Sequence, residues 1–333
     1  MVISRASSGN RDNVNDDESV PMALALIFPG QGSQSVGMGR ELAEAYPAAR
    51  QVFEEVDEAL GEKLSDLIWA GPEDRLTLTA NAQPALMAVS LAALRAAEAE
   101  GFSVDKAAYV AGHSLGEYSA LAAVGALSVA ETAKLLRIRG EAMQKAVPAG
   151  KGAMAAVLGL DHDAVVALCE ASAEGEVCQL ANDNGGGQIV ISGDKAAVER
   201  AIALAGERGA KRAIPLPVSA PFHCRLMQPA AERMAEALAG AEIRAPRVPV
   251  VANVVAAAIT DPNEIRTRLV EQVTGQVRWR ESMEYLAGQG VDTLFELGSG
   301  KVLSGLAKRI DKRLKAQPVG APADIQAALS LLN

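Results

Sequence analysis

Aromatic side chains are scarce in this chain of 333 residues: they make up 3% of it, whereas hydrophobic residues as a whole make up 49%. A core of this composition must be built from Ala, Val, Leu and Ile, which suit helices packed closely on a buried parallel sheet. The length suits one large domain, or a large domain that carries a smaller one. Together these features favour the α/β class.

Cysteine is also scarce. The three cysteines, Cys169, Cys178 and Cys224, are too few and too irregularly spaced for a disulfide framework. No Cys-x-x-Cys pair indicates zinc, so no metal site is expected. Reduced thiols are typical of a cytoplasmic protein, and Cys224 is expected to be a small buried hydrophobic residue.

Positive charge and long apolar runs are lacking as well. The formal net charge is -9, whereas nucleic-acid binding needs a basic face that releases counterions. The apolar run at residues 22–28 is far shorter than the roughly 18 residues that a membrane-spanning helix needs, and no basic segment precedes it as in a signal peptide. We therefore expect neither a nucleic-acid nor a membrane partner. Residues 1–20 are polar and acidic on balance, and they predict a disordered extension.

Strand and helix signals alternate along the rest of the chain. An apolar run at residues 24–28 ends in Pro-Gly and predicts a buried strand, and a short strand at 108–111 leads through a tight turn into a helix. Further helices are expected at residues 48–60, 81–99, 117–123, 129–147, 225–239, 263–272, 280–288 and from 301, and further strands at 248–251 and 292–297.

Residues 148–217 show a different rhythm. Strands are expected at 153–158, 177–181, 188–192 and 211–216, and helices at 161–173 and 194–208. This order, β-α-β-β-α-β, is that of a ferredoxin-like unit, and prolines and a glycine at both borders suit an inserted subdomain. The fold expected is therefore α/β, with an α/β-hydrolase-like core of residues 21–147 and 218–333, a parallel sheet, and a ferredoxin-like insert.

Chemistry is indicated first at residues 112–116, which read Gly-His-Ser-Leu-Gly. In a Gly-x-Ser-x-Gly turn between a strand and a helix, the glycines allow a sharp bend that exposes the serine hydroxyl at the helix N-terminus. Ser114 is therefore a candidate nucleophile, and the amide of Leu115 points to where an oxyanion would form. The pattern alone is weak, because glycine-rich turns with a serine also occur by chance.

A serine hydroxyl needs a base, and the chain has three histidines. His113 lies inside the turn and is expected to point aside, while His162 stands between two aspartates at a predicted helix start. Elimination leaves His223, in a proline-interrupted loop that returns from the insert, as the best base. Many acids compete for the third position, and a neutral carbonyl that orients the imidazole would also serve.

Four motifs occur together in this order: Phe-Pro-Gly-Gln-Gly-Ser-Gln at 28–34, Gly-His-Ser-Leu-Gly-Glu at 112–117, Arg139-Gly140 before Met143-Gln144, and Pro-Phe-His-Cys at 221–224. With them the chain resembles the malonyl-CoA:acyl carrier protein transacylases, the acyltransferase family that loads malonyl groups in fatty acid synthesis. The similarity runs from about residue 23 to about 313 and includes Asn182 and Asn184 before Gly-Gly-Gly-Gln.

The resemblance implies roles for single residues. Ser114 would be the nucleophile and His223 the base, oriented by a carbonyl of Gln272 in place of an acid. The amide of Gln31 would join that of Leu115 in an oxyanion hole. His113, Met143 and Asn184 lie in or beside the matching motifs and are expected to line the substrate site. The substrates would be malonyl-CoA and acyl carrier protein, without a cofactor, and the protein is expected to be a monomer.

Arg139 carries the prediction of the acyl group, because a fixed guanidinium can bind the free carboxylate of malonyl with both arms, and acetyl has no such group. The alternative is a solvated arginine on an exposed helix face, beside Arg137. The resemblance favours the carboxylate clamp. It also implies that Phe222 leaves no room for a methyl branch.

Basic residues near the end of the insert, Lys211 and Arg212, are candidates to meet the phosphates of coenzyme A or the phosphopantetheine arm, although a solvated pair is equally compatible with the sequence. The basic run at 308–313 is a candidate docking patch for an acidic carrier protein. Three alternatives stay open: an acyltransferase that loads a polyketide carrier, a serine thioesterase or hydrolase, and a carrier-binding module without catalysis.

Overall fold

The computed structural model describes residues 23–332, and its first strand, β1 (Ala23–Phe28), is buried on both faces. Leu26 and Phe28 belong to the larger apolar cluster on one face, and Ala25 and Ile27 belong to a smaller cluster on the other. Successive side chains of a strand point to opposite faces. An uninterrupted apolar run therefore places β1 inside a sheet that is covered on both sides.

Six strands form the larger sheet in the order β10-β9-β1-β2-β7-β8. The neighbours from β10 to β7 pair in parallel, and β8 pairs with β7 antiparallel. The bounds of the added strands are Ala107–Gly112 for β2, Val250–Ala252 for β7, Ala257–Ile259 for β8, Val291–Leu297 for β9 and Lys315–Val319 for β10.

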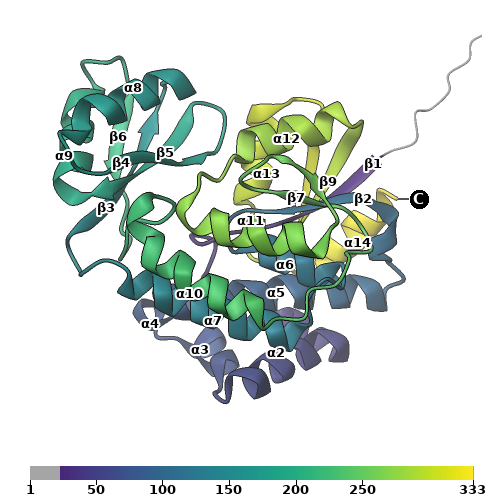
Figure 1. Cartoon of the computed structure of the whole chain (residues 1–333). Coiled ribbons are helices and arrows are strands. Elements are labelled where there is room, and N and C mark those ends of the chain that lie inside the picture. The colour runs from purple at the N-terminus through teal and green to yellow at the C-terminus, as the bar shows by residue number, and fades with distance from the viewer. Residues whose placement is uncertain (1–22, 333) are drawn as a thin grey trace, which may run out of the picture.

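Helices cover both faces of this sheet (Figure 1). The helices α12 (Trp279–Gly288) and α13 (Val302–Ile310) pack in the smaller cluster on one face. Those that pack in the larger cluster are α1 (Arg40–Ala45), α2 (Pro47–Leu60), α3 (Leu64–Ala70), α4 (Glu73–Thr77), α5 (Thr79–Ala99), α6 (Gly116–Ala123), α7 (Val129–Lys145), α10 (Gln228–Ala239), α11 (Pro262–Thr274) and α14 (Pro322–Ser330). Short 3-10 turns lie at Val104–Lys106 and Arg225–Met227.

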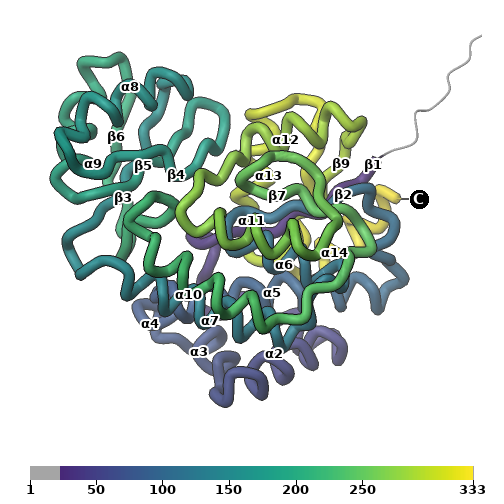
Figure 2. The backbone as a smooth tube through the Cα atoms, viewed as in Figure 1, coloured from purple at the N-terminus to yellow at the C-terminus, as the bar shows by residue number. Residues whose placement is uncertain are grey.

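A second sheet of four strands stands apart from the first, at the upper left of Figures 1 and 2. Its order is β4-β5-β3-β6, and all its pairs are antiparallel. The helices α8 and α9 pack on one face, whereas Met154 and Val190 on the other face join the larger core cluster. The bounds are β3 (Gly152–Leu158), α8 (His162–Ala173), β4 (Cys178–Asp183), β5 (Gln188–Asp194), α9 (Lys195–Ala205) and β6 (Arg212–Pro215).

The strands and helices predicted within residues 23–332 are present, with ends that differ by a few residues. The sequence did not predict α1, α3, α4, β8, β10 or α14. Most of these are short, and β10 contains Pro318, which is tolerated because the strand lies at the edge of the sheet. The extension predicted at residues 1–20 lies outside the described residues.

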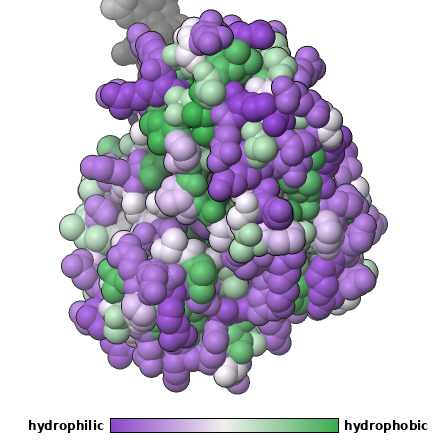
Figure 3. Space-filling view, turned by 90° about the vertical axis from the view of Figure 1, so that its left-hand side faces the viewer, coloured by the Kyte–Doolittle hydropathy of each residue, from purple (hydrophilic) through white to green (hydrophobic). Residues whose placement is uncertain are grey.

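The surface seen in Figure 3 is mostly polar, with hydrophobic residues scattered in separate patches. Within residues 23–332, no helix combines the length and the apolar character that a membrane span requires. The three cysteines are free and buried, and the thiol of Cys224 donates to the main-chain oxygen of Pro221 at 3.2 Å.

Candidate active site

The turn between β2 and α6 holds Ser114 in a left-handed conformation, with φ of 54°. A Cβ atom on Gly112 would lie 1.9 Å from the main chain of Gly116, and one on Gly116 would lie 2.2 Å from the oxygen of Phe28. Neither position can accept a side chain without moving backbone. The two glycines are therefore required by this bend, which exposes Ser114 at the start of α6.

The hydroxyl of Ser114 meets the imidazole of His223, with 2.8 Å between Oγ and Nε2. On the other side of the ring, Nδ1 lies 2.9 Å from the main-chain oxygen of Gln272 and 3.2 Å from that of Gly275. Two carbonyl acceptors require the proton on Nδ1, which leaves Nε2 free to accept. Burial, and then the charge of Arg139, lower the pKa of His223 to about 3. The ring is therefore neutral at physiological pH.

Arg139 is 1% exposed and reaches into the same place from α7. Its Nη2 lies 3.2 Å from Ser114 Oγ and 2.8 Å from Gln272 Oε1, and its Nη1 lies 2.7 Å from Gln83 Oε1. The solvated alternative is thus wrong for Arg139. The neighbouring Arg137 is partly buried and pairs with Glu62 and Asn81.

Gln272 contributes more than the carbonyl that the resemblance implied. Its side-chain nitrogen donates to the main-chain oxygen of Ser114 at 3.0 Å and to Oε2 of Glu117 at 2.8 Å. The side chain therefore links the nucleophile turn to Arg139, while the main chain orients the imidazole of His223. Gln272 is fully buried, so it supports the site from the protein interior.

The side chain of His113 reaches the insert. Its Nε2 lies 2.9 Å from Oδ1 of Asn184, at the turn after β4. Its ring also packs against that of Trp279, with centroids 5.6 Å apart. His113 therefore ties the second sheet to the nucleophile turn, a role that the motif alone does not reveal.

Ser114 lines a cavity of about 360 Å³. Its wall gathers most of the predicted site residues, namely Gln31, His113, Leu115, Arg139, Met143, Asn184, Phe222 and His223. The rest of the wall comes from the loop after β1, from α4 and α5, from the second sheet and the loop that follows it, and from α13. The substrate-sized space thus lies between the core and the insert.

Gln31 and Leu115, whose main-chain amides are the expected oxyanion donors, both line this cavity. Leu115 directly precedes α6, so its amide lies at the positive end of a helix. No acceptor for either amide is found within residues 23–332. Both donors are therefore free to receive a ligand oxygen.

Comparison with known proteins decides the family. The acyl transferase domain matches residues 25–299. The malonyl CoA-acyl carrier protein transacylase of Bacillus subtilis is 51% identical over 311 residues, which cover 93% of this chain and 97% of that protein. The chain belongs to the acyl transferase family.

Solved structures of this family agree in fold. The acyl-carrier-protein-S-malonyltransferase of Bartonella henselae is 60% identical, with a TM-score of 0.92, and the match covers 93% of this chain and 99% of that one. A malonyl-transacylase in complex with the holo acyl-carrier protein of a type II PKS is 44% identical, with a TM-score of 0.90, and the match covers 93% and 99%.

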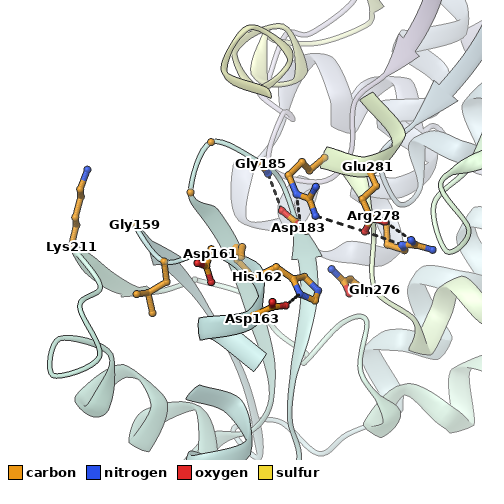
Figure 4. A pocket seen from close by; sticks show the side chains of 15 residues that line it. Gly159, Asp161, His162, Asp163, Asp183, Gly185, Lys211, Gln276, Arg278 and Glu281 are labelled. Carbon is orange, nitrogen blue, oxygen red and sulfur yellow. Dashed lines mark hydrogen bonds and ion pairs between the residues drawn. The ribbon is translucent and has the colours of Figure 1, made fainter. Parts of the chain in front are cut away.

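Not every predicted residue of this acyl transferase reaches the Ser114 cavity. Lys211 lines a separate cavity of about 1090 Å³ between the insert and α12, and Figure 4 shows it apart from Asp183, which forms an ion pair with Arg280. Arg212 is exposed on β6 and lines neither cavity. Their contact with coenzyme A therefore stays a prediction.

Sequence reasoning missed three residues that organise the site. Oδ1 of Asn253 accepts a hydrogen bond from the main-chain nitrogen of Ser114 at 2.8 Å, and its Nδ2 donates one to the main-chain oxygen of Gly112 at 2.7 Å. Gln83 holds Arg139, and Glu117 is buried behind Gln272. Glu117 alone had a signal, because an acid directly follows the Gly-x-Ser-x-Gly pattern in an apolar helix.

Proposed function

We propose that the chain transfers a malonyl group from malonyl-CoA to the phosphopantetheine thiol of an acyl carrier protein, in fatty acid biosynthesis. The observation that carries this proposal is that Ser114 Oγ lies close to two functional groups at once: it is 2.8 Å from the base His223 and 3.2 Å from the guanidinium of Arg139. The relatives named as malonyl CoA-acyl carrier protein transacylases support it over nearly the whole chain.

In the first half of the proposed reaction, Nε2 of His223 takes the proton of Ser114 Oγ as the oxygen attacks the thioester carbonyl. The carbonyl oxygen becomes an oxyanion that the amides of Gln31 and Leu115 bind. When the C–S bond breaks, His223 gives its proton to the departing thiolate. Coenzyme A leaves, and Ser114 carries a malonyl ester.

In the second half, the carrier thiol loses its proton to His223 and attacks the ester, and Ser114 regains the proton. The acyl group thus passes from thioester to ester to thioester. No electrons are gained or lost, so this balance needs neither a metal ion nor a redox cofactor.

The acyl preference is assigned to Arg139 and Phe222. The two nitrogens of the guanidinium match the two oxygens of a malonyl carboxylate, and Ser114 lies close enough for the thioester carbon to reach it. Phe222 is 8% exposed and faces the same cavity. It would restrict a methyl branch, although one methylene is worth only about 1–3 kcal/mol of discrimination. Asn184 and Met143 complete the proposed wall.

The remaining assignments concern partners and domains. Residues 148–217 are assigned as an inserted ferredoxin-like subdomain, which the strand order β4-β5-β3-β6 supports. The basic run at residues 308–313 begins in the last turn of α13, whose first turns line the cavity, and this position supports it as a carrier-docking patch. A monomeric state, a cytoplasmic location and phosphate contacts from Lys211 and Arg212 stay predictions.

The proposal is tested by incubating the enzyme with malonyl-CoA and digesting it for mass analysis. We expect a malonyl group on the Ser114 peptide and none in the Ser114→Ala variant. With carrier protein added, malonyl-carrier should exceed free malonate. Dominant release of malonate would instead favour the hydrolase alternative, and transfer by Ser114→Ala would refute the serine ester.

A further inference from the structure

Glu117 is a buried acid that the proposed reaction does not use. It is 1% exposed and lies three residues after the nucleophile, at the start of α6. Its Oε2 accepts hydrogen bonds from the main-chain nitrogen of Asn253 at 3.0 Å and from Nε2 of Gln272 at 2.8 Å. A buried carboxyl without a full partner charge is costly when ionised, so its presence here calls for a compensating charge.

Arg139 carries that charge, and the side chain of Gln272 lies between Arg139 and Glu117. Gln272 donates to Glu117 from Nε2 and accepts from Arg139 through Oε1 at 2.8 Å. The neutral side-chain amide of Gln272 therefore connects the buried cation Arg139 to the buried acid Glu117 through two hydrogen bonds. Since Arg139 Nη2 also reaches Ser114 Oγ, the chain of contacts runs from Glu117 to the place of the acyl group.

We infer that Glu117 is a specificity-determining residue: ionised, it balances Arg139 while the acyl pocket is empty, and it takes up a proton from solvent when a carboxylated acyl group binds Arg139. The inference rests on the proposed carboxylate clamp. With the acyl carboxylate bound, one guanidinium would face two anions, and protonation of Glu117 removes the second. A neutral acyl group such as acetyl causes no such change.

The hydrogen bonds leave a place for this proton. Both bonds that Glu117 accepts go to Oε2, so protonation at Oε1 keeps them. Burial raises the pKa of Glu117 to about 7 despite the two hydrogen bonds and the charge of Arg139. Around neutral pH the carboxyl can therefore exchange a proton at little cost, and a second anion on Arg139 would raise its pKa further.

Few other groups can compete with Glu117 for this role. Within residues 23–332, β1 and β7, which pack on α6, carry no charged or titratable residue. Tyr109 of β2 faces Gln289, and Arg95 and Glu98 of α5 pair with each other. On α7, which also packs on α6, Arg137 pairs with Glu62 and Lys145 with Glu141, while Glu131 and Lys134 are not buried. Among the described residues, Tyr118 and His223 are the titratable side chains that interact with Glu117 or Arg139, and His113 interacts with His223. Burial lowers the pKa of both histidines and raises that of the phenol, so all three stay neutral around pH 7.

The experiment counts protons during binding. Malonyl-CoA and acetyl-CoA are titrated calorimetrically into the Ser114→Ala variant, which cannot be acylated, at pH 8 in buffers of different ionisation enthalpy. We expect malonyl-CoA to take up more protons than acetyl-CoA, by roughly 0.4 of a proton, the uptake at pH 8 when the pKa of Glu117 rises from about 7 by about one unit. Acetyl-CoA is the matched control, because both ligands carry the same titrating phosphates. Equal proton counts would overturn the inference.

A second variant tests the residue. Glu117→Gln keeps an oxygen for both hydrogen bonds but cannot titrate. In the Ser114→Ala background we expect malonyl-CoA affinity to fall about five- to tenfold between pH 6 and 8.5, which corresponds to a coupling of about one pKa unit. With Glu117→Gln added, the affinity should not change with pH. If the affinity still falls with rising pH in the double variant, a group other than Glu117 takes up the proton.

The same titrations separate this inference from the proposed function. If Arg139→Ala leaves the preference for malonyl-CoA over acetyl-CoA unchanged, the clamp itself is wrong. If the preference depends on Arg139 but the proton counts are equal, only the role of Glu117 is wrong. Should Glu117→Gln fail to fold, the proton count of the Ser114→Ala variant still decides.

Discussion

Arg139 Nη2 lies 3.2 Å from Ser114 Oγ, so the cation and the nucleophile converge on one point of the cavity. The guanidinium is held by Gln83 and Gln272, both of them uncharged. A cation with only neutral hydrogen-bond partners, buried to 1% exposure, keeps most of its attraction for an anion. A carboxylated acyl group would supply that anion next to the hydroxyl that attacks its thioester.

Arg139→Ala should therefore lower kcat/KM for malonyl-CoA by about ten- to a hundredfold, the loss expected from charge-assisted hydrogen bonds of about 1.5–3 kcal/mol. Acetyl transfer should be spared or improved, because acetyl makes no use of the guanidinium. Arg139→Lys should restore little, since an ammonium cannot bind a carboxylate with two parallel bonds. Steady-state kinetics with both acyl-CoA substrates measures this. Equal losses on both would assign Arg139 a structural role.

The glycines of the nucleophile turn should be intolerant of the smallest side chain. In Gly112→Ala and Gly116→Ala, the new methyl group would lie 1.9 Å and 2.2 Å from backbone atoms, so β1, β2 and α6 must move apart. We expect loss of soluble protein or a large fall in melting temperature, together with loss of acylation of Ser114.

Gly288 in α12 provides the matched control for this prediction. A Cβ atom there meets nothing within 4 Å, and alanine is the better helix former by roughly 0.5–1 kcal/mol. Gly288→Ala should therefore be neutral or slightly stabilising in thermal unfolding. Normal melting and activity of the two turn variants would show that the turn can bend without glycine.

Ser114, His223 and the alternation of strands and helices were accessible from the sequence because each has a local pattern. The Gly-x-Ser-x-Gly turn, the few histidines and the period of apolar residues need no knowledge of distant contacts. Asn253 and Gln83 have no such pattern, because they act across 139 and 56 residues of chain, respectively. The sequence also could not tell that Lys211 faces a different cavity, since this depends on how the insert is seated.

Asn253 should matter for both stability and turnover. Its side chain satisfies the amide of Ser114 and the oxygen of Gly112, two polar groups of the bent turn. Asn253→Ala leaves them without these partners, at a cost of about 1–3 kcal/mol for a buried polar group. We expect a lower melting temperature and a lower kcat with little change in KM, because the position of the nucleophile changes while the acyl pocket stays.

Chemical denaturation and steady-state kinetics of Asn253→Ala check this expectation. Asn263→Ala is a control on the surface, where Asn263 lies in the first turn of α11. A kcat of wild-type size in a destabilised Asn253→Ala enzyme would limit Asn253 to holding the fold.

The pH dependence of stability should reflect His223. Its pKa falls from an ordinary 6.5 to about 3 on folding, mainly through burial. The folded state therefore binds this proton less tightly than the unfolded state, so the contribution of His223 to stability is complete above pH 6.5 and is lost as the pH falls toward 3. Glu117, whose pKa is raised to about 7 from 4.5, acts in the opposite direction and weakens the fold as the pH rises from 4.5 through 7.

Thermal unfolding of His223→Gln and Glu117→Gln across pH 4 to 9 separates the two contributions. We expect His223→Gln to lose less stability than wild type between pH 6.5 and 4, and Glu117→Gln to lose less between pH 5 and 8. Curves parallel to wild type in both variants would show that other groups set the pH dependence.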